Sequence, residues 1–250
     1  MHVKALPMRW KSGDNYCYII SDEATSQSWI IDPAYPSEIT PYLNKEAADI
    51  QMNAIVNTHH HSDHSGGNLT LLSMYNVPVI AGRGSPCVSY TPADGEVIQL
   101  GQIEITAIHT PCHTQDSICY YAKDATGSAL FTGDTLFTAG CGRFFEGNSS
   151  EMISSLAKLT KLPNDTIVYP GHEYTKGNVK WAKSILNNEA LDKLSDFCNN
   201  NEVTTGRFTI GDELKFNPFL RLNDPQVLKA TGESDPVKVM DTLRTLKNNF

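Results

Sequence analysis

A histidine-rich run constrains this chain more than any other feature of its sequence. The run reads Thr-His-His-His-Ser-Asp-His, ends at His64 and directly follows an apolar segment. Side chains alternate along extended backbone, so His59, His61 and Asp63 can share one face while His60 points away. Crowded imidazoles and carboxylates need a cation, and a run without cysteine favours a catalytic metal site over a structural one. The alternative is a polar loop in which histidines cluster by chance.

The chain up to about Gly171 is predicted to form short strands separated by turns and a few helices. The predicted strands are Tyr16–Ile20, Ser28–Ile31, Asn53–Val56, Val77–Ile80, Glu96–Leu100, Ile103–Ile108, Ser117–Ala122, Ala129–Thr132 and Ile167–Tyr169. The predicted helices are Ser37–Lys45, Asn68–Tyr75 and Ser149–Leu159. Asn148 and Glu151 are spaced as a capping box for the last helix. This alternation indicates an α+β fold, with two sheets packed face to face and covered by helices.

The pattern becomes mostly helical after His172, which predicts a domain boundary between residues 1–172 and 173–250. The stretch Asn199–Gly211, rich in Asn, Thr and Gly, is predicted to be a loop of the second unit. Asp235 followed by Pro236 is a typical helix start. The helices predicted in this unit are Gly177–Asn187, Glu189–Asn199 and Pro236–Lys247.

Composition narrows the classes of function and partner. A formal net charge of -8 and a pI near 5.4 disfavour a nucleic-acid interface, which needs clustered Lys and Arg. The six cysteines form no C-x-x-C pair, so we expect a reduced compartment and mostly buried thiols. The sequence shows no signal-peptide pattern and no apolar run of membrane-spanning length. We therefore expect a cytoplasmic monomer without a membrane or nucleic-acid partner.

Three further ligand-type residues follow predicted strands, where a rigid sheet can aim a side chain. They are His113, Asp134 and His172, and Asp134 follows a glycine that permits close backbone approach. His109 is the alternative to His113 as a metal ligand, but its place beside the strand favours a core or supporting role. The alternatives are a turn aspartate and a surface histidine. With the histidine-rich run, the candidates are five histidines and two aspartates, which suit two metal ions sharing Asp134.

The longer motifs resemble the metallo-β-lactamase superfamily and, within it, the glyoxalase II family of hydroxyacylglutathione hydrolases. Superfamily resemblance rests on the H-x-H-x-D-H run with the later His, the TGDT aspartate and the GHEY histidine. The closer resemblance rests on GCGRFFEG and on the C-terminal region, which contains FNPFLRL and ESDP before a helix. These motifs span nearly the whole chain.

The resemblance implies an αββα sandwich followed by a small helical domain that forms part of the substrate site. It implies that His59, His61 and His113 hold one metal, and that Asp134 bridges to a second. The ligands of the second metal would be Asp63, His64 and His172. The resemblance assigns glutathione binding to Arg143, Phe145, Tyr174, Arg244 and Lys247. Arg244 and Lys247 are i,i+3 neighbours on a predicted helix, so they can meet a carboxylate together.

Two positions depart from the family pattern. Phe145 stands where the family commonly has Tyr, which removes a hydroxyl worth about 0.5–1.5 kcal/mol if it binds the peptide. Arg143 replaces a more usual Lys, which keeps the charge but changes the donor geometry. Neither change touches the predicted metal ligands.

The resemblance implies hydrolysis of an S-2-hydroxyacylglutathione, such as S-D-lactoylglutathione, to the hydroxy acid and glutathione, as in methylglyoxal detoxification. The attacking group would be a hydroxide bridging two divalent ions, with Asp63 and Asp134 as catalytic residues. Zinc is the first candidate, with iron or manganese as alternatives. One alternative function is a mononuclear-iron glutathione persulfide dioxygenase, which needs two His and one carboxylate. Another is a non-catalytic metal-binding module.

Overall fold

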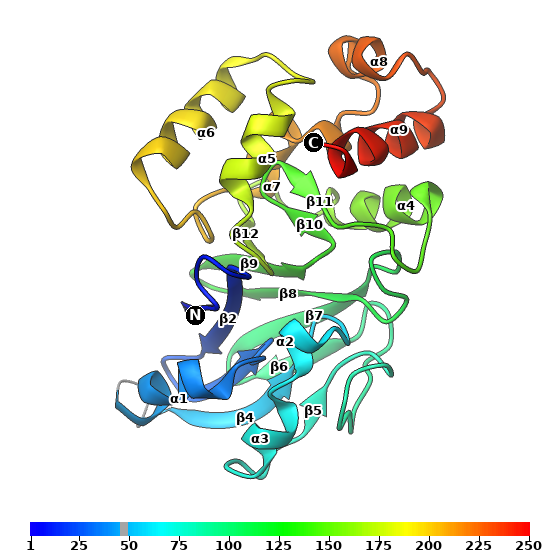
Figure 1. Cartoon of the computed structure of the whole chain (residues 1–250). Coiled ribbons are helices and arrows are strands. Elements are labelled where there is room, and N and C mark those ends of the chain that lie inside the picture. Colours follow the sequence, from blue (N-terminus) through cyan, green and yellow to red (C-terminus); the bar gives the residue numbers. More distant parts are fainter. Residues whose placement is uncertain (46–49) are drawn as a thin grey trace.

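The computed structural model describes residues 1–45 and 50–250, which form two stacked sheets enclosed by helices (Figure 1). The first sheet has the strand order β1-β2-β3-β4-β5; β1, β2 and β3 are antiparallel, and β3, β4 and β5 are parallel. Its strands are β1 (His2–Met8), β2 (Asn15–Ser21), β3 (Gln27–Ile31), β4 (Gln51–Val56) and β5 (Val79–Ile80).

The second sheet has the strand order β12-β9-β8-β7-β6, in which β12 is parallel to β9 and the other pairs are antiparallel. A two-stranded ribbon, β10–β11, follows β9. The strands are β6 (Val97–Leu100), β7 (Ile103–His109), β8 (Ile118–Asp124), β9 (Gly127–Gly133), β10 (Leu136–Phe137), β11 (Gly140–Cys141) and β12 (Ile167–Pro170).

The core between the sheets follows from side-chain alternation along the strands. Tyr18 and Ile20 of β2 face the second sheet, where they join Ile105 and Tyr120 in one buried cluster. Ile19 points to the other face and packs in the cluster beneath the helices of the first sheet. Burying each of these apolar side chains stabilises the fold by about 1.5–3 kcal/mol. Because the buried side chains alternate along the strands, the strand patterns favour the layered arrangement.

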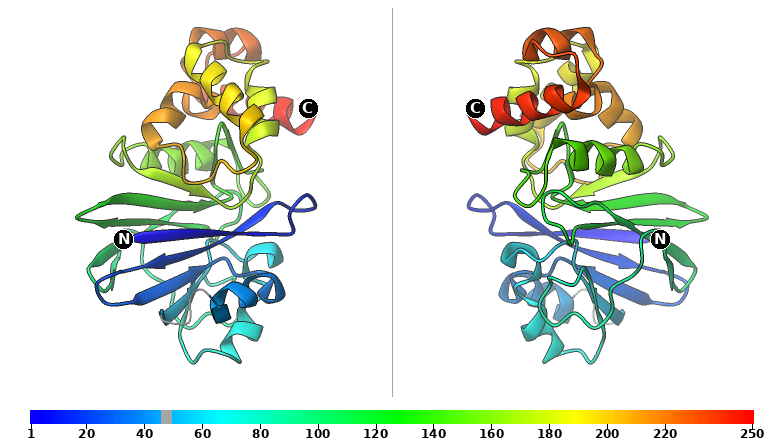
Figure 2. Two further views of the ribbon diagram at one scale, coloured as in Figure 1. Left: turned by 90° about the vertical axis from the view of Figure 1, so that its left-hand side faces the viewer. Right: turned by 90° about the vertical axis from the view of Figure 1, so that its right-hand side faces the viewer.

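Helices cover the outer faces of both sheets (Figure 2). The first sheet is covered by α1 (Pro36–Lys45), α2 (Ser62–Ser65) and α3 (Asn68–Leu72). The helices on the side of the second sheet are α4 (Ser149–Leu159), α5 (Thr175–Ala182), α6 (Glu189–Asn200), α7 (Ile210–Phe216), α8 (Pro225–Thr231) and α9 (Pro236–Asn248), with the 3₁₀ turn η1 (Pro218–Leu220). None of the helices within the described residues is long and apolar enough to cross a membrane.

The predicted αββα arrangement is confirmed, and each predicted strand overlaps an observed one, with bounds that differ by one or two residues at several ends. The capping box of Asn148 and Glu151 is confirmed by both reciprocal hydrogen bonds. β1 was not predicted, although its residues pair with β2 from His2 opposite Ser21 to Met8 opposite Asn15.

Several predicted boundaries were wrong. The helix predicted to reach Tyr75 ends at Leu72, and the one predicted over 177–187 is α5, which begins at Thr175 and ends at Ala182. The N-cap of α5 is Tyr174, whose side chain makes no capping hydrogen bond, so the sequence carries no start signal there. The helices α7 and α8 were not predicted.

Candidate metal centre

The seven predicted ligands come together at one edge of the two sheets. His59 and His61 follow β4, and the short helix α2 carries Asp63 and His64. The other three each follow a strand of the second sheet: His113 after β7, Asp134 after β9 and His172 after β12. Chain segments far apart in sequence therefore converge because strand ends of both sheets meet at this edge.

Close backbone approach around Asp134 requires glycine. Gly133 has φ +47°, and a Cβ at this position would lie 2.3 Å from Thr58 Oγ1. A Cβ at Gly171 would lie 2.5 Å from Asp134 Oδ1. The predicted role of the glycine before Asp134 is therefore confirmed, and the glycine before His172 has a similar one.

One group of candidate ligands consists of three histidines. His61 Nδ1 lies 3.1 Å from His59 Nε2 and 3.1 Å from His113 Nε2, so three ring nitrogens point at a common centre. Three unprotonated nitrogens this close repel one another unless a cation or proton lies between them.

The second group consists of Asp63, His64 and His172. Nε2 of His64 and Nε2 of His172 are 3.2 Å apart, and Asp63 Oδ2 lies 3.5 Å from the latter. Asp134 lies between the two groups: its Oδ1 is 3.4 Å from His64 Nε2, and its Oδ2 is 3.4 Å from His113 Nε2. Asp134 Oδ1 is buried and accepts no hydrogen bond from the described residues, as expected of an oxygen reserved for a cation.

The opposite ring nitrogens are held by the protein. Nδ1 of His59 contacts Thr58 Oγ1 (3.1 Å), and Nδ1 of His64 contacts Asp32 Oδ2 (2.9 Å). His113 Nδ1 contacts the Arg143 carbonyl (3.0 Å), and His172 Nδ1 contacts the Gly13 carbonyl (2.8 Å). A proton on each anchored nitrogen leaves the other nitrogen free to donate its lone pair, which is the arrangement that metal-binding histidines use. The donor set therefore fits divalent cations.

The electrostatics favour the protonation state that a cation needs at His59 and Asp134, and oppose it at His64. Burial, together with neighbouring His64, holds the pKa of His59 well below its usual value. Burial opposes ionisation of Asp134, but His172 and His64 outweigh it and hold the pKa of this carboxyl well below its usual range. Burial also disfavours charged His64, yet Asp134 and Asp32 raise its pKa to about 9. Metal binding therefore has to displace a proton from His64 near neutral pH.

Asp32 is a supporting residue that the sequence analysis missed. Its side chain is buried and accepts from Thr58 N (2.7 Å), Thr58 Oγ1 (2.6 Å) and His64 Nδ1 (2.9 Å). Asn15 is a second such residue, since its Nδ2 donates to Asp63 Oδ2 (3.1 Å). Asp32 directly follows the strand β3, so the strand-end signal that identified Asp134 also applied to it.

The predicted geometry of the histidine-rich run was right in one part and wrong in another. His60 points away from the site, with Nδ1 2.8 Å from Asp116 Oδ1. The extended backbone ends at Val56, however: residues 58–60 form a bend, and α2 begins at Ser62. Asp63 therefore joins His64 instead of the face of His59 and His61. His109 lies outside the ligand groups, as predicted, and its Nε2 contacts the Pro92 carbonyl (2.8 Å).

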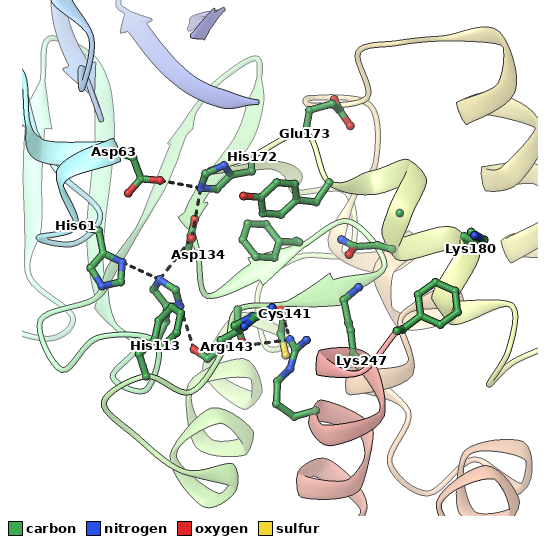
Figure 3. A pocket seen from close by; sticks show the side chains of 18 residues that line it. His61, Asp63, His113, Asp134, Cys141, Arg143, His172, Glu173, Lys180 and Lys247 are labelled. Carbon is green, nitrogen blue, oxygen red and sulfur yellow. Dashed lines mark hydrogen bonds and ion pairs between the residues drawn. The ribbon is translucent and has the colours of Figure 1, made fainter. Parts of the chain in front are cut away.

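A cavity of about 770 Å³ opens from the ligand groups toward the helical unit (Figure 3). The predicted substrate-binding residues all line it. Phe145 is 61% exposed and its ring lies 5.2 Å from that of His113, while the Tyr174 ring stacks on His172 at 4.5 Å. Arg244 is buried and donates to the Cys141 carbonyl (2.8 Å). The cavity thus joins a metal-binding end to a cationic end.

The sandwich and its two ligand groups define a protein of the metallo-β-lactamase class with a divalent metal centre. The model of the metallo-β-lactamase superfamily matches residues 12–89 and 88–172. The model described as the hydroxyacylglutathione hydrolase C-terminus matches residues 173–250. Together with the full-length relatives described next, these matches show that the chain belongs to the hydroxyacylglutathione hydrolase family.

Two yeast relatives cover nearly the whole chain. A probable hydroxyacylglutathione hydrolase of Schizosaccharomyces pombe is 50% identical over 96% of this chain and 95% of its own. The cytoplasmic isozyme of hydroxyacylglutathione hydrolase from Saccharomyces cerevisiae is 49% identical, with complete coverage of both chains. Among solved structures, ETHE1 from Myxococcus xanthus superposes with a TM-score of 0.69 at 26% identity, covering 100% of this chain and 91% of the other. The predicted family and fold are confirmed.

Proposed function

We propose that the chain hydrolyses S-2-hydroxyacylglutathione thioesters, such as S-D-lactoylglutathione, to the hydroxy acid and glutathione. The observation that carries this proposal is the cavity. One of its ends holds the two ligand groups that share Asp134, and the other end holds cations suited to the carboxylates of glutathione. Membership of the hydroxyacylglutathione hydrolase family supports the same substrate class. A cytoplasmic location and a monomeric state remain predictions.

The centre is proposed to hold two divalent ions, with zinc first among the candidates and iron or manganese as alternatives. His59, His61 and His113 would hold one ion, and Asp63, His64 and His172 the other, with Asp134 shared. Such ions lower the pKa of bound water toward neutrality and polarise a carbonyl oxygen. A persulfide dioxygenase with one iron would need two histidines and one carboxylate, whereas both groups are complete here.

The residues of the chain direct the attack on the thioester. Asn15 donates from Nδ2 to both the carboxylate and the carbonyl of Asp63, which fixes the Asp63 side chain where it lines the cavity. The carboxylate can then orient the attacking oxygen and accept its proton. Attack forms a C–O bond and breaks the C–S bond. The departing thiol has a pKa near 8.5, so it leaves as a thiolate without a strong general acid.

The cationic end is proposed to bind glutathione. Arg244 and Lys247 lie one turn apart on α9 and both line the cavity, as does Arg143 on the loop after β11. The Arg244 guanidinium is fixed by the Cys141 carbonyl and by the Phe219 ring at 5.5 Å, so little side-chain entropy remains to be lost on binding. Phe145 and Tyr174 would flank the peptide between the cations and the metal groups.

Free-thiol release from S-D-lactoylglutathione tests the proposal. The purified protein should release thiol, lose this activity on chelation and recover it when zinc, iron or manganese is restored. Protein that retains two metal ions per chain yet releases no thiol would contradict the proposed substrate.

Replacing Phe145 with Tyr should lower KM for the glutathione thioester by about twofold to tenfold. The added hydroxyl restores a hydrogen bond to the peptide worth about 0.5–1.5 kcal/mol. The ring is exposed, so the hydroxyl has room without repacking. Steady-state kinetics would measure the change, and Phe145→Leu serves as a control that keeps apolar contact but adds no donor. An unchanged KM in Phe145→Tyr would place the peptide away from this ring.

The ratio kcat/KM should fall as pH rises through about 8. Burial, and then the neighbouring Arg244 charge, lower the pKa of Lys247 to about 8. Above this pH the free enzyme presents a neutral amine, which binds a carboxylate poorly. Lys247→Arg should move this fall in kcat/KM to higher pH, because a guanidinium stays protonated. If kcat/KM falls at the same pH in this variant and in the wild type, another group causes the fall.

A further inference from the structure

The cavity has a fourth cation, Lys180, for which the functions above give no role. Lys180 lies in α5 and lines the cavity with Lys247 and Phe250. Its Nζ lies 5.5 Å from the centroid of the Phe250 ring, whereas Lys247 Nζ lies 5.1 Å from that of Trp181. Figure 3 shows both lysines on the side of the cavity away from His61 and Asp63. Each ammonium group is thus held over its own aromatic ring.

No carboxylate neutralises this end of the cavity within the described residues. The ion pairs of the described chain involve none of the cations Arg143, Lys180, Arg244 and Lys247. The third acid that lines the cavity, Glu173, accepts from Tyr16 and Thr204 instead. This positive end in a chain of net charge -8 is complementary to a ligand with more than one anionic group.

Three of the cations form one group, and Lys180 stands apart from them. Arg244 and Arg143 both contribute to lowering the pKa of Lys247, after burial, whereas Lys180 lies over a different aromatic ring from Lys247. Arg244 and Lys247 share one helix, whereas Lys180 belongs to α5. The two carboxylates of glutathione lie at opposite ends of the tripeptide, so one turn of α9 cannot hold both. A second cation on another helix meets that requirement.

We propose that Lys180 is a substrate-binding residue that holds the glutathione carboxylate not bound by Arg244 and Lys247. This inference rests on the proposed function, because it takes the glutathione thioester as the ligand. Lys180 is exposed and lies on the side of the cavity away from His61 and Asp63 (Figure 3), so it should act on KM and leave kcat nearly unchanged.

Lys180→Gln should raise KM for S-D-lactoylglutathione by about threefold to tenfold, the range expected for a charge-assisted contact near solvent. Two modified thioesters then identify the carboxylate. One carries a C-terminal glycine amide, and the other carries 4-aminobutyryl in place of γ-glutamyl, so each lacks one carboxylate. The Lys180→Gln penalty should disappear with one thioester and persist with the other. Lys247→Gln should show the opposite pattern.

The matched control is Lys183→Gln, since Lys183 lies just after α5 and its Nζ is bound to Asp192 Oδ1 (2.8 Å). It should leave KM unchanged, while Lys180→Arg should keep wild-type binding. An unchanged KM in Lys180→Gln, or both penalties disappearing with the same thioester, would overturn the assignment while wild-type turnover left the proposed function intact. A wild-type protein that does not cleave S-D-lactoylglutathione would overturn both.

Discussion

Replacing Asp134 with Ala is expected to lower kcat by about a thousandfold and to reduce the metal content to one ion per chain or fewer. Asp134 lies between the two ligand groups and has one buried oxygen without a hydrogen-bond partner. Loss of this carboxylate removes a shared ligand and the acid that lies close to His64, His113 and His172. Metal-ion catalysis contributes several kcal/mol to transition-state stabilisation, and each ~1.4 kcal/mol is a factor of ten in rate.

Metal analysis, steady-state kinetics and thermal unfolding would be measured together on the Asp134→Ala protein. Asp165→Ala is a suitable control, because Asp165 is exposed and lies in a turn just before β12. The folded state should survive in both variants, so a loss of activity without a loss of fold identifies the centre. Wild-type turnover by a protein holding one ion would refute the shared-carboxylate arrangement.

The ligands could be predicted from sequence because each follows an apolar strand. His113, Asp134 and His172 all follow strands of the second sheet, and the parallel and antiparallel pairing brings these ends to one edge. Local sequence therefore carried enough information to name the set. The division into groups was not derivable from an extended backbone, because the turn of α2 moves Asp63 to the side of His172.

The ribbon β10–β11 shows what local sequence could not reveal. Its strands are two residues long, and Ala139 between them has φ +56°, which is unfavourable outside glycine. The ribbon is held by distant side chains: Asn217 Nδ2 donates to the Gly140 carbonyl (3.0 Å), and the Ala139 N–H donates to Glu213 (3.0 Å). Asn178 donates to the Thr138 carbonyl (3.0 Å). No local pattern encodes contacts of this kind.

Through these contacts the helical unit holds the ribbon β10–β11 in place, in addition to supplying cations that line the cavity. The ribbon leads from Asp134 at the metal end to the loop that carries Arg143 at the cationic end. Polar side chains of α5 and α7, together with Asn217, fix its backbone from the helical side. The helices therefore set the distance between the two ends of the cavity as well as lining one of them.

Asp32→Asn should weaken metal binding by about tenfold to a hundredfold, the usual cost of losing a partner that orients a ligating histidine. Asp32 Oδ2 accepts from Thr58 Oγ1 and lies 2.9 Å from His64 Nδ1, so a neutral amide oxygen would polarise and orient the imidazole less strongly. Asparagine is the informative replacement because Asp32 has φ +54°, a conformation that Asn tolerates better than Ala does.

Metal titration of the apo form, followed by activity at limiting and at excess metal, would measure the effect of Asp32→Asn. Activity should fall at limiting metal and recover largely at excess metal, because all seven proposed metal ligands are still present. Thr58→Val is the comparison variant: it removes the hydroxyl that contacts Asp32 and His59 Nδ1 but keeps the carboxylate beside His64, so its loss of metal affinity should be smaller. Equal losses in the two variants would contradict a special role of the Asp32 carboxylate in orienting His64.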